Sequence, residues 1–240
     1  MEQLALRAIH ARLLAHFGPQ QWWPAESAFE VMIGAILTQN TAWTNVERAL
    51  TRLRARVPLT AAAILALAEP ELAEALRPSG YYHLKTMRVR AFCSAYEAGG
   101  GFSALAARDT HSLRTWLLAV KGIGPETADD ILLYAFDRPV FVVDAYTRRL
   151  FSRLGLLPGK PGYESIRHAF EQALGPDVDL FKEYHALIVS QGKTVCRQRP
   201  RCGLCAVASL CAAASSDSLD PSPETDLARA RHRGPTPFDE

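Results

Sequence analysis

The stretch LLAVKGIGPETADDILLYAF, residues 117–136, decides the fold. It predicts a helix, a tight turn and a second helix. Gly122 and Gly124 allow backbone conformations that are forbidden to other residues, and Pro125 suits the first position of the following helix. Free amide groups at such a turn, on Gly122, Ile123 and Gly124, can bind a phosphate oxygen without reading any base. The stretch therefore predicts a helical hairpin suited to a nucleic-acid backbone.

Helical periodicity continues on both sides of this hairpin. Apolar residues fall on one helix face at Ile9, Leu13 and Phe17, and again just ahead of the turn. The segment most like a strand, PVFVV at 139–143, is too short and too isolated to build a sheet. The sequence predicts an all-α fold of about ten helices joined by short turns rich in Gly and Pro.

Composition and charge indicate a globular protein with a basic body. The 240 residues are 48% hydrophobic and 22% charged, which excludes general disorder. No apolar run reaches the ~18 residues of a membrane helix, and the start lacks the apolar core of a signal peptide, so we expect a cytoplasmic protein with no membrane contact. The net charge of +2 divides into +5 over residues 1–211 and −3 over 212–240, where we expect a flexible acidic tail. The basic body fits nucleic-acid binding or an ordinary solvated surface.

Four of the five cysteines share the spacing C-x5-C-x2-C-x5-C: Cys196, Cys202, Cys205 and Cys211. Four thiolates at short spacing suit zinc or an iron–sulfur cluster, and the lack of a nearby histidine favours a 4Fe-4S cluster. Disulfides are a poor interpretation in a chain expected to be cytoplasmic. The metal could serve only to cross-link the loop. The fifth cysteine, Cys93, is expected to be a small buried apolar residue.

The loop between the first two of these cysteines carries three arginines, Arg197, Arg199 and Arg201. Guanidinium groups on a loop fixed by a metal could form a phosphate-binding edge, although a solvated loop would show the same pattern. A metal would make the loop rigid, which favours the DNA-binding interpretation.

Three features occur in one order along the chain: the hairpin, the segment VVDAYTRRL (142–150) and the four-cysteine loop. In this order they resemble the helix–hairpin–helix DNA glycosylases of the endonuclease III superfamily. Shorter matches are ILTQNT (36–41), GYYHLK (80–85) and KGIGPETA (121–128), and the resemblance covers residues 20–211.

The resemblance implies two all-α domains with an active cleft between them. Residues 25–135 would form a six-helix barrel that holds the hairpin, and residues 1–24 and 136–211 would form the cluster-bearing domain. Proteins of this superfamily act in base excision repair, flipping a damaged base out of double-stranded DNA and cutting its N-glycosidic bond. We expect a monomer, associated with the nucleoid, that binds double-stranded DNA containing damaged bases.

On this resemblance Asp144 matches the catalytic aspartate of the family. Departure of the base leaves an oxocarbenium-like sugar, and a nearby carboxylate stabilises that cation and orients or deprotonates the attacking water. Asp144 also has the sequence position of an N-cap for the helix AYTRRLFSRL, residues 145–154. Both roles can hold at once, since a helix N-terminus keeps the carboxylate ionised.

Glu126 departs from the endonuclease III type. At this position, two residues after the second hairpin glycine, that type carries a lysine that forms a Schiff base with the sugar and cleaves the strand. A carboxylate cannot form the imine, so we expect a monofunctional glycosylase that leaves an intact abasic site. Glu126 has either a catalytic role of its own or only that of a favourable acid in a first helical turn. The first cysteine interval is also one residue shorter than we expect for most cluster-bearing relatives.

Trp22 and Trp23 in WWP, with Trp43 after ILTQNT, look like the branch of the superfamily that removes 3-methyladenine and related alkylated purines. Alkylation of a ring nitrogen gives a cationic purine, which an indole face favours. The same tryptophans could equally pack the junction between the domains.

Three further residues take their expected positions from the resemblance. Gln39 matches the residue that enters the gap left by the flipped base, where its amide can hydrogen-bond the estranged partner. Tyr82 and Lys85 lie where the barrel faces the cleft in relatives. Lys85 either contacts a phosphate or is solvated.

The main hypothesis is a monofunctional DNA glycosylase with a 4Fe-4S cluster (alternatively zinc), acting on alkylated purines through Asp144. A second hypothesis within the class is a glycosylase for oxidised pyrimidines or mismatches. A third is a helix–hairpin–helix module that binds damaged DNA without cutting it, with Asp144 only a helix cap.

Overall fold

The computed structural model describes residues 1–214, and this part consists of helices joined by turns, with no strand. It contains twelve α-helices, slightly more than predicted, and confirms the all-α fold. Their bounds are α1 (Gln3–Phe17), α2 (Ala28–Leu37), α3 (Trp43–Arg54), α4 (Ala61–Ala66), α5 (Glu69–Leu76), α6 (Tyr82–Ala98), α7 (Gly101–Ala106), α8 (Thr110–Ala119), α9 (Pro125–Ala135), α10 (Ala145–Arg153), α11 (Tyr163–Leu174) and α12 (Val178–Thr194). Short 3-10 helices lie at Arg77–Ser79, Cys202–Leu204 and Ala208–Leu210.

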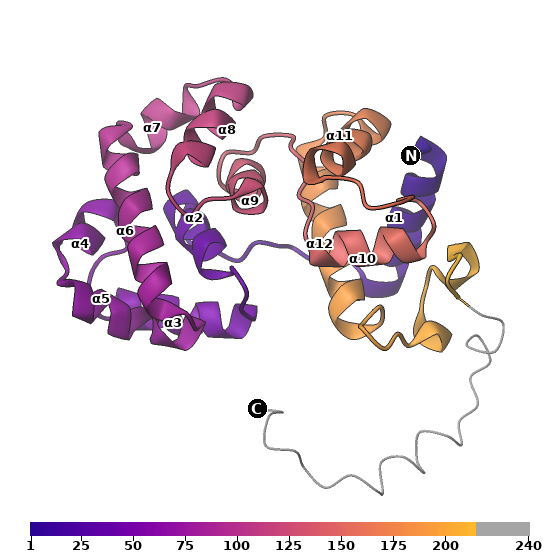
Figure 1. Cartoon of the computed structure of the whole chain (residues 1–240), viewed down its shortest axis with the longest axis horizontal. Coiled ribbons are helices and arrows are strands. Elements are labelled where there is room, and N and C mark those ends of the chain that lie inside the picture. The colour runs from indigo at the N-terminus through magenta and orange to yellow at the C-terminus, as the bar shows by residue number, and fades with distance from the viewer. Residues whose placement is uncertain (215–240) are drawn as a thin grey trace, which may run out of the picture.

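The helices form two groups that lie side by side in Figure 1. In one group, α2 to α9, α6 packs against α4 and α5, and α9 packs against α2 and α8. In the other, α12 packs against α1 and α10. The chain starts in the second group, crosses to the first through residues 18–27 and returns through residues 136–144. α9 and α12 contact each other, so these two helices link the groups.

The position of α9 between α2, α8 and α12 buries nearly all of it. Residues 127–135 are buried, and residues 30–37 of α2 are buried as well. A helix covered on all sides must find partners for the polar side chains it carries. Asp129 has them: its two carboxylate oxygens accept from Arg114 Nε (2.6 Å) and Nη2 (3.1 Å).

The apolar run at 139–143 forms no strand and is a buried, extended connection. Its backbone is satisfied by side chains of α11 instead of a neighbouring strand. The amide of Phe141 donates to Glu171 Oε1 (3.0 Å), and the amide of Val143 donates to the Tyr163 hydroxyl (3.4 Å). Phe141 stacks on Phe170 with ring centroids 4.0 Å apart. This connection leads directly into Asp144, and its burial fixes where that residue lies.

The predicted hairpin is present, with α8, a turn and α9 beginning at Pro125. Gly122 has a φ of +93°, and a Cβ added there would lie 2.4 Å from Arg88 Cγ. Gly122 is therefore required both by its backbone conformation and by the close approach of α6. Gly124 has a φ of −95°, which any residue adopts. The prediction that both glycines are needed for their backbone conformation is thus correct for Gly122 and wrong for Gly124.

Within residues 1–214 no helix is both long enough and apolar enough to cross a bilayer. Of the acidic tail predicted at 212–240, residues 215–240 lie outside the described part of the chain. Cys93 is fully buried on α6, as its sequence context predicts.

Candidate active site

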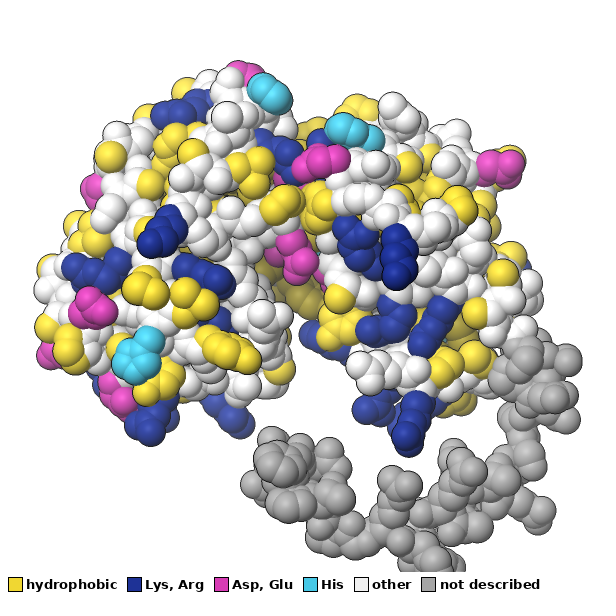
Figure 2. All heavy atoms as spheres, viewed as in Figure 1, with side chains coloured by type: hydrophobic (Ala, Val, Ile, Leu, Met, Phe, Trp, Pro, Cys, Tyr) yellow, Lys and Arg dark blue, Asp and Glu magenta, His cyan; other side chains and the backbone are white. Residues whose placement is uncertain are grey.

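A pocket of about 700 Å³ lies between the two groups of helices. In Figure 2 the molecule is hollowed between the groups, with acidic side chains in the hollow and Lys and Arg side chains on either side of it. Helix α9 contributes Glu126 and Asp130 to the pocket, and Asp144 enters it from the residue ahead of α10. Helix α12 contributes His185 and Lys193. The pocket thus brings together titratable side chains from both groups.

Three tryptophans line the same pocket: Trp22, Trp23 and Trp43. The Trp23 ring packs edge-on against Trp43 with centroids 5.0 Å apart, and it lies 5.3 Å from the ring of Tyr134. Lys193 Nζ lies 5.3 Å from the centroid of the Trp22 ring. All three rings are half-buried and pack on the core. Each of them therefore lines the pocket and packs the junction at the same time.

Asp144 caps helix α10, as its sequence position predicts. Its Oδ1 accepts two hydrogen bonds from Thr147, one from the backbone N (2.7 Å) and one from Oγ1 (2.8 Å). Its Oδ2 faces His185 Nε2 at 3.7 Å. Burial alone would raise the pKa of Asp144, but His185 and the Thr147 donors outweigh burial and lower the pKa. The structure therefore holds an ionised carboxylate in the pocket.

His185, in the body of α12, faces Asp144 and lines the same pocket. Its Nδ1 lies 2.8 Å from the Tyr134 hydroxyl oxygen, and that hydroxyl donates to the Lys182 carbonyl (3.2 Å). Burial would lower the pKa of His185, but the carboxylates of Asp144, Asp130 and Glu126 together raise it. The charged imidazolium is favoured chiefly because it faces the ionised carboxylate of Asp144.

Glu126, Asp130 and Tyr134 follow one another at intervals of four residues, so they share one face of α9. Glu126 lies at the exposed end of this row, in the first turn of the helix. The protein around it, and then the charge of Asp144, raise the pKa of Glu126. Asp130 lies deeper and is 8% exposed. Burial, with the charges of the neighbouring carboxylates, raises the pKa of Asp130 to about 8, although His185 acts in the opposite direction.

The hairpin turn borders this site through Gln39. Gln39 Nε2 donates to the Gly122 carbonyl (3.1 Å) and to Thr127 Oγ1 (2.9 Å), while its Oε1 accepts from Arg88. The side chain is thus tied to the hairpin and does not project into solvent. The amides of Gly122 and Gly124 lie on an exposed turn, and Ile123 between them is buried.

Lys85 requires a correction. We expected it to contact a phosphate or to be solvated, but it is 1% exposed. Its Nζ donates to the carbonyls of Leu37 (2.9 Å) and Ser79 (2.5 Å), at the ends of two neighbouring helical segments. Burial lowers the pKa of Lys85 to about 8. The amine satisfies carbonyl groups that the helices leave free, so it is a structural residue. The Tyr82 ring lies 4.2 Å from the His83 ring at an angle of 36°, and Tyr82 does not line the pocket.

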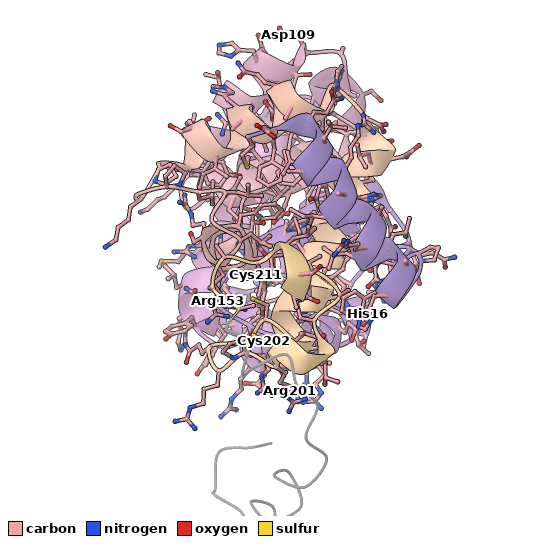
Figure 3. The ribbon with its side chains drawn as sticks, turned by 90° about the vertical axis from the view of Figure 1, so that its right-hand side faces the viewer. His16, Asp109, Arg153, Arg201, Cys202 and Cys211 are labelled. Atoms are coloured by element: carbon pink, nitrogen blue, oxygen red, sulfur yellow. The ribbon has the colours of Figure 1, made fainter. Side chains whose placement is uncertain are left out.

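The four cysteines of the loop line a second, smaller cavity of about 70 Å³: Cys196, Cys202, Cys205 and Cys211. Arg153 Nη1 donates to Cys196 Sγ (3.3 Å), and Gln191 Nε2 donates to Cys205 Sγ (3.0 Å). In Figure 3, Cys202 and Cys211 lie near Arg153. Within residues 1–214, no three His, Cys, Asp or Glu side chains are arranged to hold a single metal ion.

The arginines of the loop, Arg197, Arg199 and Arg201, are exposed. Arg201 lies at the lower edge of the molecule in Figure 3, beside the cysteine cavity that it helps to line. Within residues 1–214 their guanidinium groups form no hydrogen bond, and it is the carbonyls of Arg197 and Gln198 that accept from Arg153. The three guanidinium groups are therefore free to contact a phosphate.

Sequence reasoning missed Asp130 and His185. The intervals of four from Glu126 to Asp130 to Tyr134 were visible in the sequence and could have placed Asp130 beside Glu126. Nothing in the apolar run around His185 marks it, because its role depends on the packing of α12 against α9 and α10.

The hairpin of α8, the turn and α9, set in an all-helical fold, identifies a helix–hairpin–helix protein. Residues 33–176 match the HhH-GPD superfamily of base excision DNA repair proteins. The chain belongs to this superfamily.

Individual relatives agree with this membership. A protein of Methanocaldococcus jannaschii assigned as a DNA repair glycosylase is 47% identical over 206 residues, which are 85% of this chain and 94% of that protein. The structure of H. pylori 3-methyladenine DNA glycosylase bound to 1,N6-ethenoadenine matches with a TM-score of 0.69 and 30% identity, covering 80% of this chain and 98% of that one. A non-covalent endonuclease III–DNA complex has a TM-score of 0.78 at 20% identity, covering 92% and 100% of the two chains, which is a likeness of fold.

Proposed function

We propose that this protein is a DNA glycosylase that hydrolyses the N-glycosidic bond of a damaged base flipped out of double-stranded DNA. The observation that carries this proposal is the Asp144 carboxylate, held ionised in an aromatic-lined pocket between the two groups of helices. Membership in a base excision repair superfamily and the likeness to DNA glycosylases support it.

The proposed chemistry assigns Asp144 to the sugar. As the base departs, positive charge develops on the sugar, and an ionised carboxylate in a partly dry pocket stabilises that charge. Asp144 Oδ1 is occupied by Thr147, so Oδ2 is the oxygen that faces the substrate side and His185. Oδ2 can also orient a water molecule and accept its proton as the water adds to the sugar. Thr147 and His185 position the carboxylate through their own contacts.

The substrate we favour is an alkylated purine such as 3-methyladenine. A purine with a methylated ring nitrogen is cationic, and three tryptophans, whose ring faces attract cations, line the pocket. The ionised carboxylate of Asp144 adds attraction for a cation. The similarity to a 3-methyladenine DNA glycosylase supports this choice over oxidised pyrimidines or mismatches.

We further propose that the enzyme is monofunctional. Glu126 occupies the first turn of α9, and a carboxylate cannot form a Schiff base with the sugar. Lys193 is an amine that lines the pocket, and its Nζ lies against the Trp22 ring. Borohydride trapping on a duplex with a damaged base should therefore give no covalent adduct. Any covalent adduct would overturn the monofunctional proposal. If that adduct is lost in Lys193→Met, Lys193 is the nucleophile.

DNA contact is assigned to both groups of helices. The exposed amides of the hairpin turn, at Gly122 and Gly124, would bind the phosphate backbone beside the lesion. Gln39, next to this turn, would enter the gap left by the flipped base once its contacts with the hairpin open. The first group would be the six-helix barrel domain, residues 25–135. The second group would be the cluster-bearing domain, which combines residues 1–24 with residues 136–211. The loop arginines would meet the backbone from the second domain: Arg197, Arg199 and Arg201.

We also propose a 4Fe-4S cluster, which Cys196, Cys202, Cys205 and Cys211 would hold. They come from one loop, they line one cavity, and N–H donors reach two of their sulfur atoms, as thiolate ligands require. When bound, the cluster supplies four thiolate–iron bonds that cross-link the loop. Zinc is the alternative. Hydrolysis of the glycosidic bond involves no redox step, so the cluster would act on the shape of the arginine-bearing loop.

Base release from three duplexes tests the proposed function. We expect release from a duplex with 3-methyladenine and little from duplexes with thymine glycol or a mismatch. Preferred release of thymine glycol or a mismatched base would favour the second type of glycosylase. Tight binding with no release from any duplex would favour a damage-binding module without chemistry.

A further inference from the structure

Asp130 is a buried acid for which the chemistry above has no use. It lines the pocket, is 8% exposed, and its Oδ1 has no hydrogen-bond partner within residues 1–214. Its neighbour in sequence, Asp129, is fully buried but is held by Arg114. An unpaired polar atom in a protein interior costs free energy unless it has another use. A carboxyl group left without a partner in the wall of a pocket points to a ligand in that pocket.

The groups around Asp130 favour its protonated form. Burial is the largest effect, and the nearby carboxylates add to it, so that the pKa of Asp130 rises to about 8 while His185 acts in the opposite direction. Asp144, in the same pocket, has its pKa lowered. Two carboxyl groups whose surroundings drive their pKa values apart are the usual arrangement of an acid and a base. The titratable groups that face Asp130 are Glu126, Asp129 and Tyr134 on α9, Asp144 ahead of α10, Tyr163 on α11 and His185 on α12.

We propose that Asp130 is the general acid of this pocket, and that it donates its proton to an uncharged damaged purine as that base leaves. The inference rests on the proposed glycosylase function and extends its substrate class. A cationic alkylated purine leaves as a neutral molecule and needs no proton. An uncharged modified purine would leave as an anion, and a proton from the enzyme removes that cost.

The proposed step balances. The bond between sugar C1′ and the ring nitrogen breaks, its electron pair leaves with the base, and the Asp130 proton moves to a nitrogen of the base. Water adds to C1′ and gives its proton to Asp144. The base leaves in its neutral form, and C1′ of the sugar gains a hydroxyl group from the water. The enzyme ends with Asp130 ionised and Asp144 protonated, and exchange of one proton through solvent restores both.

The test compares two substrates in Asp130→Asn. Single-turnover release is measured from a duplex with 3-methyladenine, whose base is cationic, and from a duplex with hypoxanthine, whose base is uncharged. General acid catalysis contributes about 10²–10⁴-fold, so we expect hypoxanthine release to fall about 100-fold while 3-methyladenine release stays within about threefold. Asn replaces a protonated carboxyl with little change of shape, so the variant should keep its melting temperature.

The pH profile supplies a second readout. In the unaltered enzyme the ratio of hypoxanthine to 3-methyladenine release should fall as pH rises through about 8, where Asp130 loses its proton. Titration of His185 would act on both substrates through Asp144 and would cancel in this ratio. Asp130→Asn should make the ratio independent of pH.

Asp179→Asn, in the exposed first turn of α12, is the matched control and should change neither rate. Should Asp130→Asn melt early, Asp130→Ala provides the same comparison. An equal loss on both substrates, or a ratio that does not depend on pH in the unaltered enzyme, would overturn the assignment. Release of 3-methyladenine with no release of hypoxanthine would also overturn it and leave the proposed function intact. No release of either base would reject both.

Discussion

The imidazole of His185 faces the carboxylate of Asp144, with Nε2 3.7 Å from Oδ2. This separation suits an ion pair and is too long for a direct hydrogen bond. Burial opposes the charge on each side chain, yet each raises the stability of the other's charged form. Tyr134, 2.8 Å from Nδ1, holds the other side of the ring. The protonation of His185, in the interior of α12, is thus coupled to the charge of Asp144, the N-cap of α10.

Replacing Asp144 by Asn separates its two roles. Asn is as good an N-cap as Asp, so the loss of stability should come from the broken pair with His185 alone and be about 3 kcal/mol, as in His185→Gln. Base release should fall by about 10³-fold, because an amide cannot stabilise the sugar cation or accept a proton. Binding to a duplex with the damaged base should remain. Asp177→Asn is the matched control, since Asp177 caps α12 in the same way and lies outside the pocket. Full release by Asp144→Asn would reject the catalytic assignment.

His185 should make the stability of the protein depend on pH. Its pKa in the folded chain is raised, so its stabilising effect is complete below its ordinary value of 6.5 and is lost as pH rises through the higher folded value. The urea midpoint should therefore fall as pH rises above 6.5. In His185→Gln it should already be low at pH 6, because removing one member of a buried pair costs about 3 kcal/mol.

The control for this measurement is His111→Gln, which changes an exposed histidine of α8. It should keep the same dependence on pH as the unaltered protein. A similar dependence in His185→Gln would mean that another group titrates, and the pair with Asp144 would not be its origin.

Local pattern was sufficient to predict much of this fold. The hairpin, the start of α9 at Pro125 and the cap at Asp144 all depend on residues within one or two turns of each other, which sequence displays directly. The error at Gly124 has a local cause as well: glycine permits a positive φ but does not demand it. Of the two hairpin glycines, Gly122, against which Arg88 packs, is the one that requires the absence of a side chain.

The functional site could be predicted less well than the fold, because it depends on contacts between residues far apart in sequence. Lys85 looks like a surface residue in GYYHLK, but its amine reaches the Leu37 carbonyl, 48 residues away in sequence. His185 reaches Asp144 and Tyr134 only because α12 packs against α10 and α9. The chemistry of such residues depends on which helices contact each other, and a single sequence does not show those contacts.

The two hairpin glycines should respond differently to alanine. Gly122→Ala forces a side chain into a φ of +93° and a Cβ within 2.4 Å of Arg88 Cγ, so it should cost about 1–3 kcal/mol. Thermal unfolding would show this as a lower melting temperature, and weaker DNA binding should accompany it. Gly124→Ala is the internal control: its φ is −95° and no atom lies within 4 Å of the added Cβ. Equal melting temperatures for the two variants would contradict the observed turn.

The cysteine loop makes a prediction about metal content that is independent of the pocket. If the four cysteines hold a 4Fe-4S cluster, the purified protein should be brown and contain about four iron atoms per chain. Cys211→Ser should lose iron and weaken DNA binding, because the loop that carries Arg197, Arg199 and Arg201 would lose its cross-link. The rate of base release at saturating DNA should fall less than DNA binding does, since Asp144 lies in a separate pocket. Cys93→Ala, a buried cysteine of α6 outside the loop, should keep all of its iron. A colourless protein with one zinc per chain would replace the cluster by zinc, and iron retained in full by Cys211→Ser would remove Cys211 from the ligand set.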